Sequence, residues 1–139
     1  ALHATQAAIE EGILPGGGVA LIRAKKAITS DDLGAKIVLS SLSMPMTKIL
    51  TNAGFENPYS IITSVESSKS DWEGYDIKTN KMTDFLKSGI IDPTKVVRSA
   101  LENAASVAGT ILLTDACVYS EKEKGEADDQ EFGGMGGMM

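Results

Sequence analysis

Apolar residues recur at helical spacing over most of the chain, which predicts a mostly helical fold. The strongest pattern runs over residues 93–114, where one helical face collects Val97, Leu101, Ala104, Ala105, Ala108, Ile111 and Leu112. A second apolar face covers residues 35–53, and Pro45 within it should kink or interrupt the helix. Residues 1–11 and 19–28 are also expected to be helical. The pattern leaves room for only one or two short strands.

Glycine and proline mark the expected ends of these helices. Gly12 follows the first helix and suits a left-handed terminal position, and Gly89 should end a short helix in the same way. Asn57-Pro58 and Asp92-Pro93 each place a capping residue before a proline, an order typical of a helix N-terminus. Both pairs are therefore expected to begin helices.

The remaining segments are shorter and less regular. Residues 58–65 and 81–89 are expected to form short helices, and residues 66–72 a polar loop. Residues 73–79 favour a short strand or a turn. Residues 116–120 are rich in β-prone side chains and predict a strand that needs a partner from elsewhere in the fold.

Composition excludes several classes of protein. The 139 residues suit one domain or a piece of one, with 42% hydrophobic and 23% charged residues, as in globular chains. Aromatic residues make up only 5%, so we expect a core of Ala, Val, Ile, Leu and Met. Cys117 and His3 are the only residues of their types, which excludes a disulfide framework and chemistry that needs several histidines. No run approaches the roughly 18 apolar residues of a membrane span.

Charge and glycine separate the C-terminal end from the rest. The net charge is −6, and six acidic residues but only two lysines lie over residues 121–131. Residues 133–139, GGMGGMM, contain no side chains that pack a core. We expect residues 121–139 to be a flexible tail, acidic and then rich in Gly and Met. The acidic balance disfavours nucleic acid as a partner.

Three positions are candidates for chemistry, each with a simpler alternative. Gly16-Gly17-Gly18 could admit a ligand to backbone N–H groups at a helix start, or form only a tight turn between helices. The spacing fits neither a P-loop nor a Rossmann fingerprint. Asp92 could contact a ligand or only cap the helix that follows it. Tyr75, with Asp76 beside it, could pack against a base or only be half-buried.

Three stretches together resemble the C-terminal end of the group I chaperonins, the bacterial GroEL type and its organellar relatives. They are ALHATQAAIEEGILPGGGVALIRA, GIIDPTKVVRSALENAASVAG and the terminal GGMGGMM. The resemblance covers nearly the whole chain and is weakest over residues 54–82. It implies that residues 1–120 are the C-terminal half of an equatorial, ATP-binding domain, mostly α with one or two short strands, and that residues 121–139 are its disordered Gly/Met tail.

The resemblance also implies a set of ATP-contacting residues: Gly16, Gly17, Tyr75, Asp76, Ile90 and Asp92. Within this set Asp92 would meet the ribose, Ile90 would lie near the adenine, and the Tyr75–Asp76 pair would lie at the adenine edge. Asp76 stands where the family has Asn, and an ionised Asp accepts hydrogen bonds but donates none. Ile77 and Lys78 stand where the family commonly has small residues.

The family's catalytic aspartate would come immediately before Ala1, and the loop that binds phosphate and magnesium lies far upstream. Residues 1–11 also read as a helix that begins without a capping residue, so we expect an excised fragment. We therefore expect no catalytic residue and no metal ligand in this chain, with the Mg and K ligands of the ATPase outside it. The fragment alone should be inactive.

The resemblance implies an ATP-dependent protein-folding chaperonin that works as a double heptameric ring. Its partners would be neighbouring subunits, a co-chaperonin and unfolded client proteins, with no nucleic acid and no membrane. The expected location is the bacterial cytoplasm, with an organellar matrix or plastid as the alternative. The alternative function is a helical interaction module without nucleotide binding, in which the glycines and Asp92 serve only as turn and cap.

Overall fold

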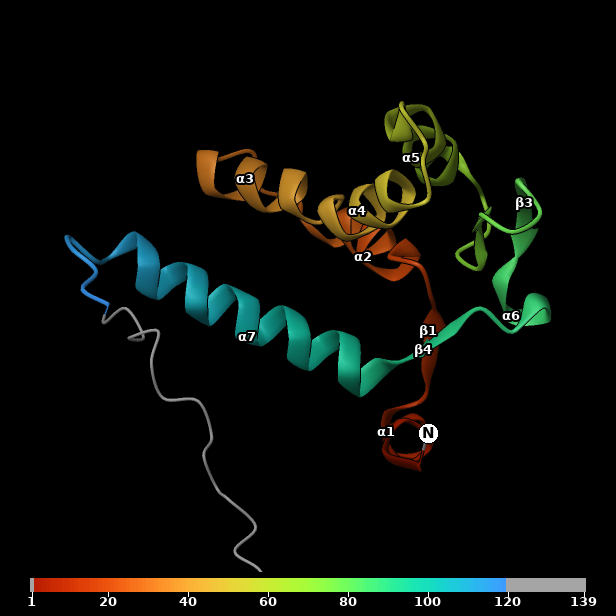
Figure 1. The fold of residues 1–139 in the computed structure, drawn as a ribbon, viewed down its shortest axis with the longest axis horizontal. Helices are drawn as coiled ribbons and strands as arrows, with labels where there is room; N and C mark the ends of the chain where they lie inside the picture. The colour runs from red at the N-terminus through yellow and green to blue at the C-terminus, as the bar shows by residue number, and fades with distance from the viewer. Residues whose placement is uncertain (1, 120–139) are drawn as a thin grey trace, which may run out of the picture.

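The computed structural model describes residues 2–119, and it is mostly helical (Figure 1). The expected tail from residue 121 onward lies outside these residues. The helices are α1 (Leu2–Glu11), α2 (Val19–Ala24), α3 (Leu33–Ser41), α4 (Met44–Asn52), α5 (Pro58–Ser67), α6 (Phe85–Ser88) and α7 (Thr94–Leu112), and the 3-10 turn η1 (Lys25–Ala27) follows α2. The strands are β1 (Ile13–Pro15), β2 (Glu73–Asp76), β3 (Lys81–Asp84) and β4 (Ile91–Pro93).

Most predicted helix ends are confirmed. Gly12, at φ 81°, follows α1, and Gly89, at φ 70°, follows α6. The helix expected over residues 35–53 is two helices, because Pro45 lies in the first turn of α4 and cannot continue α3. The side chain of Asp32 accepts a hydrogen bond from the Ala35 N–H at 2.7 Å and so caps α3.

The strands form two antiparallel pairs, β1 with β4 and β2 with β3. Residues 81–84 were expected to be helical and instead form β3, because they complete a hairpin with β2 around Asn80, a turn residue at φ 55°. Only the second half of that segment is helical, as α6. Residues 116–119 form no strand and pair with none of the four described strands.

The core lies where α2, α4 and α5 meet the β2–β3 hairpin and α6. Its buried cluster consists of Val19, Ile22, Met46, Leu50, Ile62, Val65 and Phe85. Six of these side chains belong to the aliphatic and methionine set that the composition predicts. Phe85 is the exception: it is 2% exposed and is among the largest fully buried side chains.

The short β1–β4 ribbon connects this core to a second group of helices (Figure 1). In this group α1 packs against α7, and the far end of α7 extends away from the other helices. No residue of α7 is buried, and its apolar residues Val107, Ile111 and Leu112 are 59%, 67% and 85% exposed. None of the helices described over residues 2–119 has the length and apolar character needed to cross a bilayer.

Candidate functional site

One cavity, of about 510 Å³, brings together segments that are far apart in the sequence. Its walls come from the turn between β1 and α2, from α4, from β2 and the turn after it, and from the segment between α6 and α7. All six residues that the resemblance assigns to nucleotide contact line it: Gly16, Gly17, Tyr75, Asp76, Ile90 and Asp92. We refer to this space as the six-residue cavity.

The glycine turn forms one wall and is fixed by the backbone. The Gly16 N–H donates to the Ile90 carbonyl oxygen at 3.0 Å, and a Cβ on Gly16 would lie 3.2 Å from that oxygen. Gly18 has φ 83°, and a Cβ there would lie 2.9 Å from the Met46 nitrogen. A side chain at Gly18 would collide with the backbone of α4 in a left-handed conformation, and one at Gly16 would press on Ile90, so the turn favours glycine.

Asp92 lies on the same wall, and its predicted role as a helix cap is wrong. It belongs to β4, where it pairs with Leu14 of β1, and the capping position of α7 is Pro93, which makes no side-chain cap hydrogen bond. Asp92 is thus one residue too far from the helix to reach its first N–H groups. Its half-buried carboxylate makes no hydrogen bond to any residue between 2 and 119 and is available to a ligand.

Another wall is formed by β2. The Tyr75 ring meets the Phe55 ring edge to face, with centroids 5.8 Å apart. One carboxylate oxygen of Asp76 accepts the Lys78 N–H at 2.9 Å, and the other accepts the Thr79 hydroxyl at 2.8 Å. The Thr79 hydroxyl, followed by the Lys78 N–H, lowers the pKa of Asp76. Asp76 is therefore held ionised at this wall and can only accept hydrogen bonds.

Phe85 also lines the cavity, and the sequence patterns gave no sign of it. A Cβ on Gly74 would lie 2.6 Å from the Phe85 ring, and a Cβ on Gly17 would lie 3.5 Å from it. The ring thus lies between β2 and the glycine turn and spaces the two walls. Ile77 and Lys78, the residues that depart from the small side chains of the resemblance, also line the cavity.

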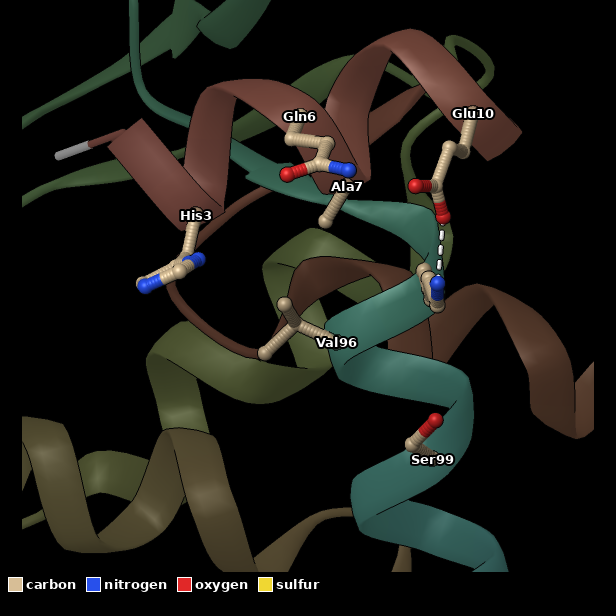
Figure 2. A pocket seen from close by; sticks show the side chains of 7 residues that line it. His3, Gln6, Ala7, Glu10, Val96 and Ser99 are labelled. Carbon is tan, nitrogen blue, oxygen red and sulfur yellow. Dashed lines mark hydrogen bonds and ion pairs between the residues drawn. The ribbon is translucent and has the colours of Figure 1, made fainter.

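A second cavity, of about 470 Å³, lies between α1 and α7 (Figure 2). Its walls are formed by His3, Gln6, Ala7, Glu10, Lys95, Val96 and Ser99, none of which was predicted as a site residue. The ion pair of Glu10 with Lys95 crosses it, drawn as the dashed line in Figure 2. No three His, Cys, Asp or Glu side chains gather as metal ligands would, here or elsewhere in the described chain.

A second ion pair ties the same two helices together. The Arg98 guanidinium contacts a carboxylate oxygen of Glu11 at 2.6 Å and also pairs with Glu102 on its own helix at 2.9 Å. The hydrogen bond from Arg98 lowers the pKa of Glu11, and the hydrogen bond from Lys95 lowers the pKa of Glu10. These pairs fix α1 on the first turns of α7, directly beyond the β1–β4 ribbon that carries Asp92.

Comparisons with known proteins agree with this architecture. The solved structure of a group III chaperonin in the open state is similar to the chain, with a TM-score of 0.72 and 25% sequence identity. The match covers 81% of the chain, which spans only 25% of that longer protein. The mostly helical fold matches that of a chaperonin equatorial-domain fragment. The family model described as TCP-1/cpn60 chaperonin matches residues 1–122, and the chain belongs to this family.

Proposed function

We propose that this chain is the C-terminal part of the equatorial domain of an ATP-dependent, protein-folding chaperonin of group I, and that the six-residue cavity is the nucleoside half of its ATP site. One observation carries the proposal: six residues assigned from sequence resemblance, drawn from separate segments between Gly16 and Asp92, line a single cavity. The alternative function, a helical interaction module without nucleotide binding, does not explain why these segments line the same cavity.

The two walls divide the recognition of a nucleoside between them. On the ribbon side, the free carboxylate of Asp92 accepts hydrogen bonds from the ribose hydroxyls, and the bare backbone of Gly16 and Gly17 lets the ligand approach closely. On the hairpin side, the ionised Asp76 accepts from the amino group of adenine. Ile90 supplies an apolar surface for the base between these polar ends.

The rest of the proposed ATPase lies outside this chain. The catalytic aspartate, the phosphate loop and the ligands of Mg and K would come from upstream segments. The proposed partners are neighbouring subunits of a double heptameric ring, a co-chaperonin and unfolded clients, in the bacterial cytoplasm or an organelle. The motif PGGGVALIRA and the terminal GGMGGMM support group I in particular.

The substitution Asp92→Ser tests the proposal in the full-length subunit that contains this chain. Serine is shorter and uncharged, and charge-assisted hydrogen bonds contribute about 1.5–3 kcal/mol, so ATP affinity should fall roughly ten- to a hundredfold. Because Asp92 caps no helix and its side chain makes no hydrogen bond within residues 2–119, the melting temperature should stay near that of the parent. A nucleotide titration and a melting curve on the same sample measure both.

Asp84→Ser is the matched control. Asp84 caps α6 by accepting from the N–H groups of Leu86 and Lys87, at 3.0 and 3.2 Å, and it does not line the cavity. Serine also caps helices well, so this variant should keep its affinity for ATP. If Asp92→Ser binds ATP as tightly as Asp84→Ser and the parent, the proposed ribose contact is wrong.

A further inference from the structure

Arg23, on α2, makes four side-chain hydrogen bonds outside the six-residue cavity, all of them to backbone carbonyls. Its side chain is 9% exposed. One terminal nitrogen donates to the carbonyl oxygens of Val65 at 2.7 Å and Ser68 at 3.4 Å. The other donates to those of Ser70 at 2.9 Å and Glu73 at 3.0 Å. A single guanidinium therefore holds four backbone carbonyls within nine residues of chain.

These four carbonyls belong to the segment that delivers β2 to the cavity. The Val65 carbonyl lies near the C-terminal end of α5, the next two lie in the loop, and Glu73 is the first residue of β2. Two residues further along the same strand come Tyr75 and then Asp76. The contacts of Arg23 therefore help to set the position of β2, the strand that carries Tyr75 and Asp76 into the cavity wall.

The chemistry of the contact requires arginine. A planar guanidinium offers five N–H donors in a fixed fork, whereas a lysine ammonium is a compact point charge that cannot span carbonyls on both sides. The remaining donor, the Arg23 Nε, is buried without a hydrogen-bond acceptor. It lies 4.0 Å from Asp71, whose side chain is 74% exposed, so Arg23 contacts the loop carbonyls only through its two terminal nitrogens.

We infer that Arg23 is a positioning residue for base recognition, an inference that rests on the proposed nucleotide site. Arg23 itself does not line the cavity and acts through β2. The wall that carries Asp92, which we call the ribose wall, is held separately, by the pairing of Leu14 with Asp92 and by the Gly16–Ile90 hydrogen bond. Loss of the Arg23 contacts should therefore displace one wall and leave the other in place. Discrimination between bases should fall more than nucleotide affinity as a whole.

The experiment compares ATP with inosine triphosphate in the full-length subunit that contains this chain. Inosine carries a carbonyl oxygen where adenine carries the amino group, so it presents an acceptor to the carboxylate of Asp76. The parent should prefer ATP by about tenfold or more, as expected for one hydrogen bond to a charged group. In Arg23→Lys this preference should fall at least about threefold, because Asp76 is no longer held at the base. Titrations with each nucleotide give the ratio.

Lys26→Gln is the matched control, since Lys26 follows α2 and pairs with Asp71 at 3.6 Å but contacts none of the four carbonyls. It should keep the parent's preference. A glycine inserted between Lys69 and Ser70 disturbs the same contacts from the loop side and should reduce the preference as Arg23→Lys does. If Arg23→Lys does not fold, the insertion variant decides the question alone.

The remaining outcomes separate this inference from the proposed function. A parent that binds neither nucleotide contradicts the proposed function itself. A parent that binds both equally overturns the role of Arg23 in base recognition while the nucleotide site stands. The same conclusion follows if the variants lose affinity for both nucleotides by one common factor, because Arg23 then supports only the folded state.

Discussion

Gly74 shows how closely single residues are fitted around the six-residue cavity. A Cβ at this position would lie 2.6 Å from the Phe85 ring and 2.8 Å from a Val19 methyl group, and both of these side chains are buried in the core. Real Cβ contacts are not this short, so any side chain here must move β2, the phenyl ring or α2. The space between the cavity walls therefore depends on the absence of one methyl group.

We expect Gly74→Ala to lower the free energy of unfolding by about 1–3 kcal/mol, the usual cost of overpacking a core. Gly109→Ala is the control: Gly109 lies within α7, and a Cβ there meets nothing within 4 Å. That variant should gain about 0.5–1 kcal/mol from helix propensity. Urea unfolding of both variants measures the difference. An alanine at position 74 that costs no stability would show that β2 is not in contact with Phe85.

The sequence identified the cavity residues but not all that surrounds them. Patterns in the sequence singled out the glycine turn and Asp92 but favoured a turn and a helix cap, and only the resemblance assigned Gly16 and Asp92 to nucleotide contact. Phe85 could not be found in this way, because no periodicity marks a residue that begins a four-residue helix. Arg23 was missed for a related reason. Its partners are backbone carbonyls, which every residue has, so no residue type in the sequence marks them.

The short elements were harder to predict than the long ones. Helices α1, α5 and α7 were expected within a few residues of their observed ends, because apolar spacing, glycine and proline act locally. Residues 81–84 were predicted to be helical and form a strand, whereas residues 116–119 were predicted to form a strand and form none. A short strand depends on whether a partner edge is close in space, and that information lies in distant segments.

The ion pairs between α1 and α7 should make stability depend on pH. Arg98 lowers the pKa of Glu11 in the folded state below its ordinary value of 4.5. The stabilising contribution is therefore complete above that value and is lost as the pH falls through the lower, folded-state pKa. Glu11→Gln should be less stable than the parent at neutral pH and should lose less stability on acidification.

Chemical denaturation at a series of pH values between about 7 and 3 tests this expectation. Glu56→Gln is the control, because Glu56 is exposed and forms no ion pair within residues 2–119. Its unfolding profile should run parallel to that of the parent. Parallel profiles for Glu11→Gln and the parent would instead show that the Glu11–Arg98 pair contributes nothing to stability.

On the scale of the whole molecule, the core and α7 differ sharply in how they are covered. The core cluster is enclosed by helices α2, α4 and α5 and by the β2–β3 hairpin. The apolar face predicted for α7 is present, but Leu101 and Ile111 on it are 43% and 67% exposed. In the proposed intact subunit, this face is where upstream segments of the equatorial domain would pack.

The 139-residue chain by itself should release no phosphate from ATP above background. The proposed cavity has groups for the nucleoside, whereas the catalytic aspartate and the phosphate loop are expected in upstream segments. A steady-state phosphate-release assay on the purified chain measures this, with the full-length subunit as the positive control. Turnover by the chain that disappears in Asp92→Ser would contradict the proposed division of the site.

The β1–β4 ribbon has a consequence for how such a sequence can diverge. Main-chain hydrogen bonds hold Gly16 against Ile90 and pair Leu14 with Asp92, and these bonds are indifferent to which side chain sits at most strand positions. Exposed ribbon residues such as Ile13 can therefore be substituted during evolution without displacing the ribose wall. The hairpin wall is also held by main-chain pairing, of β2 with β3, but its connection to α5 and α2 depends on the Arg23 side chain. We therefore expect lineages to differ chiefly there.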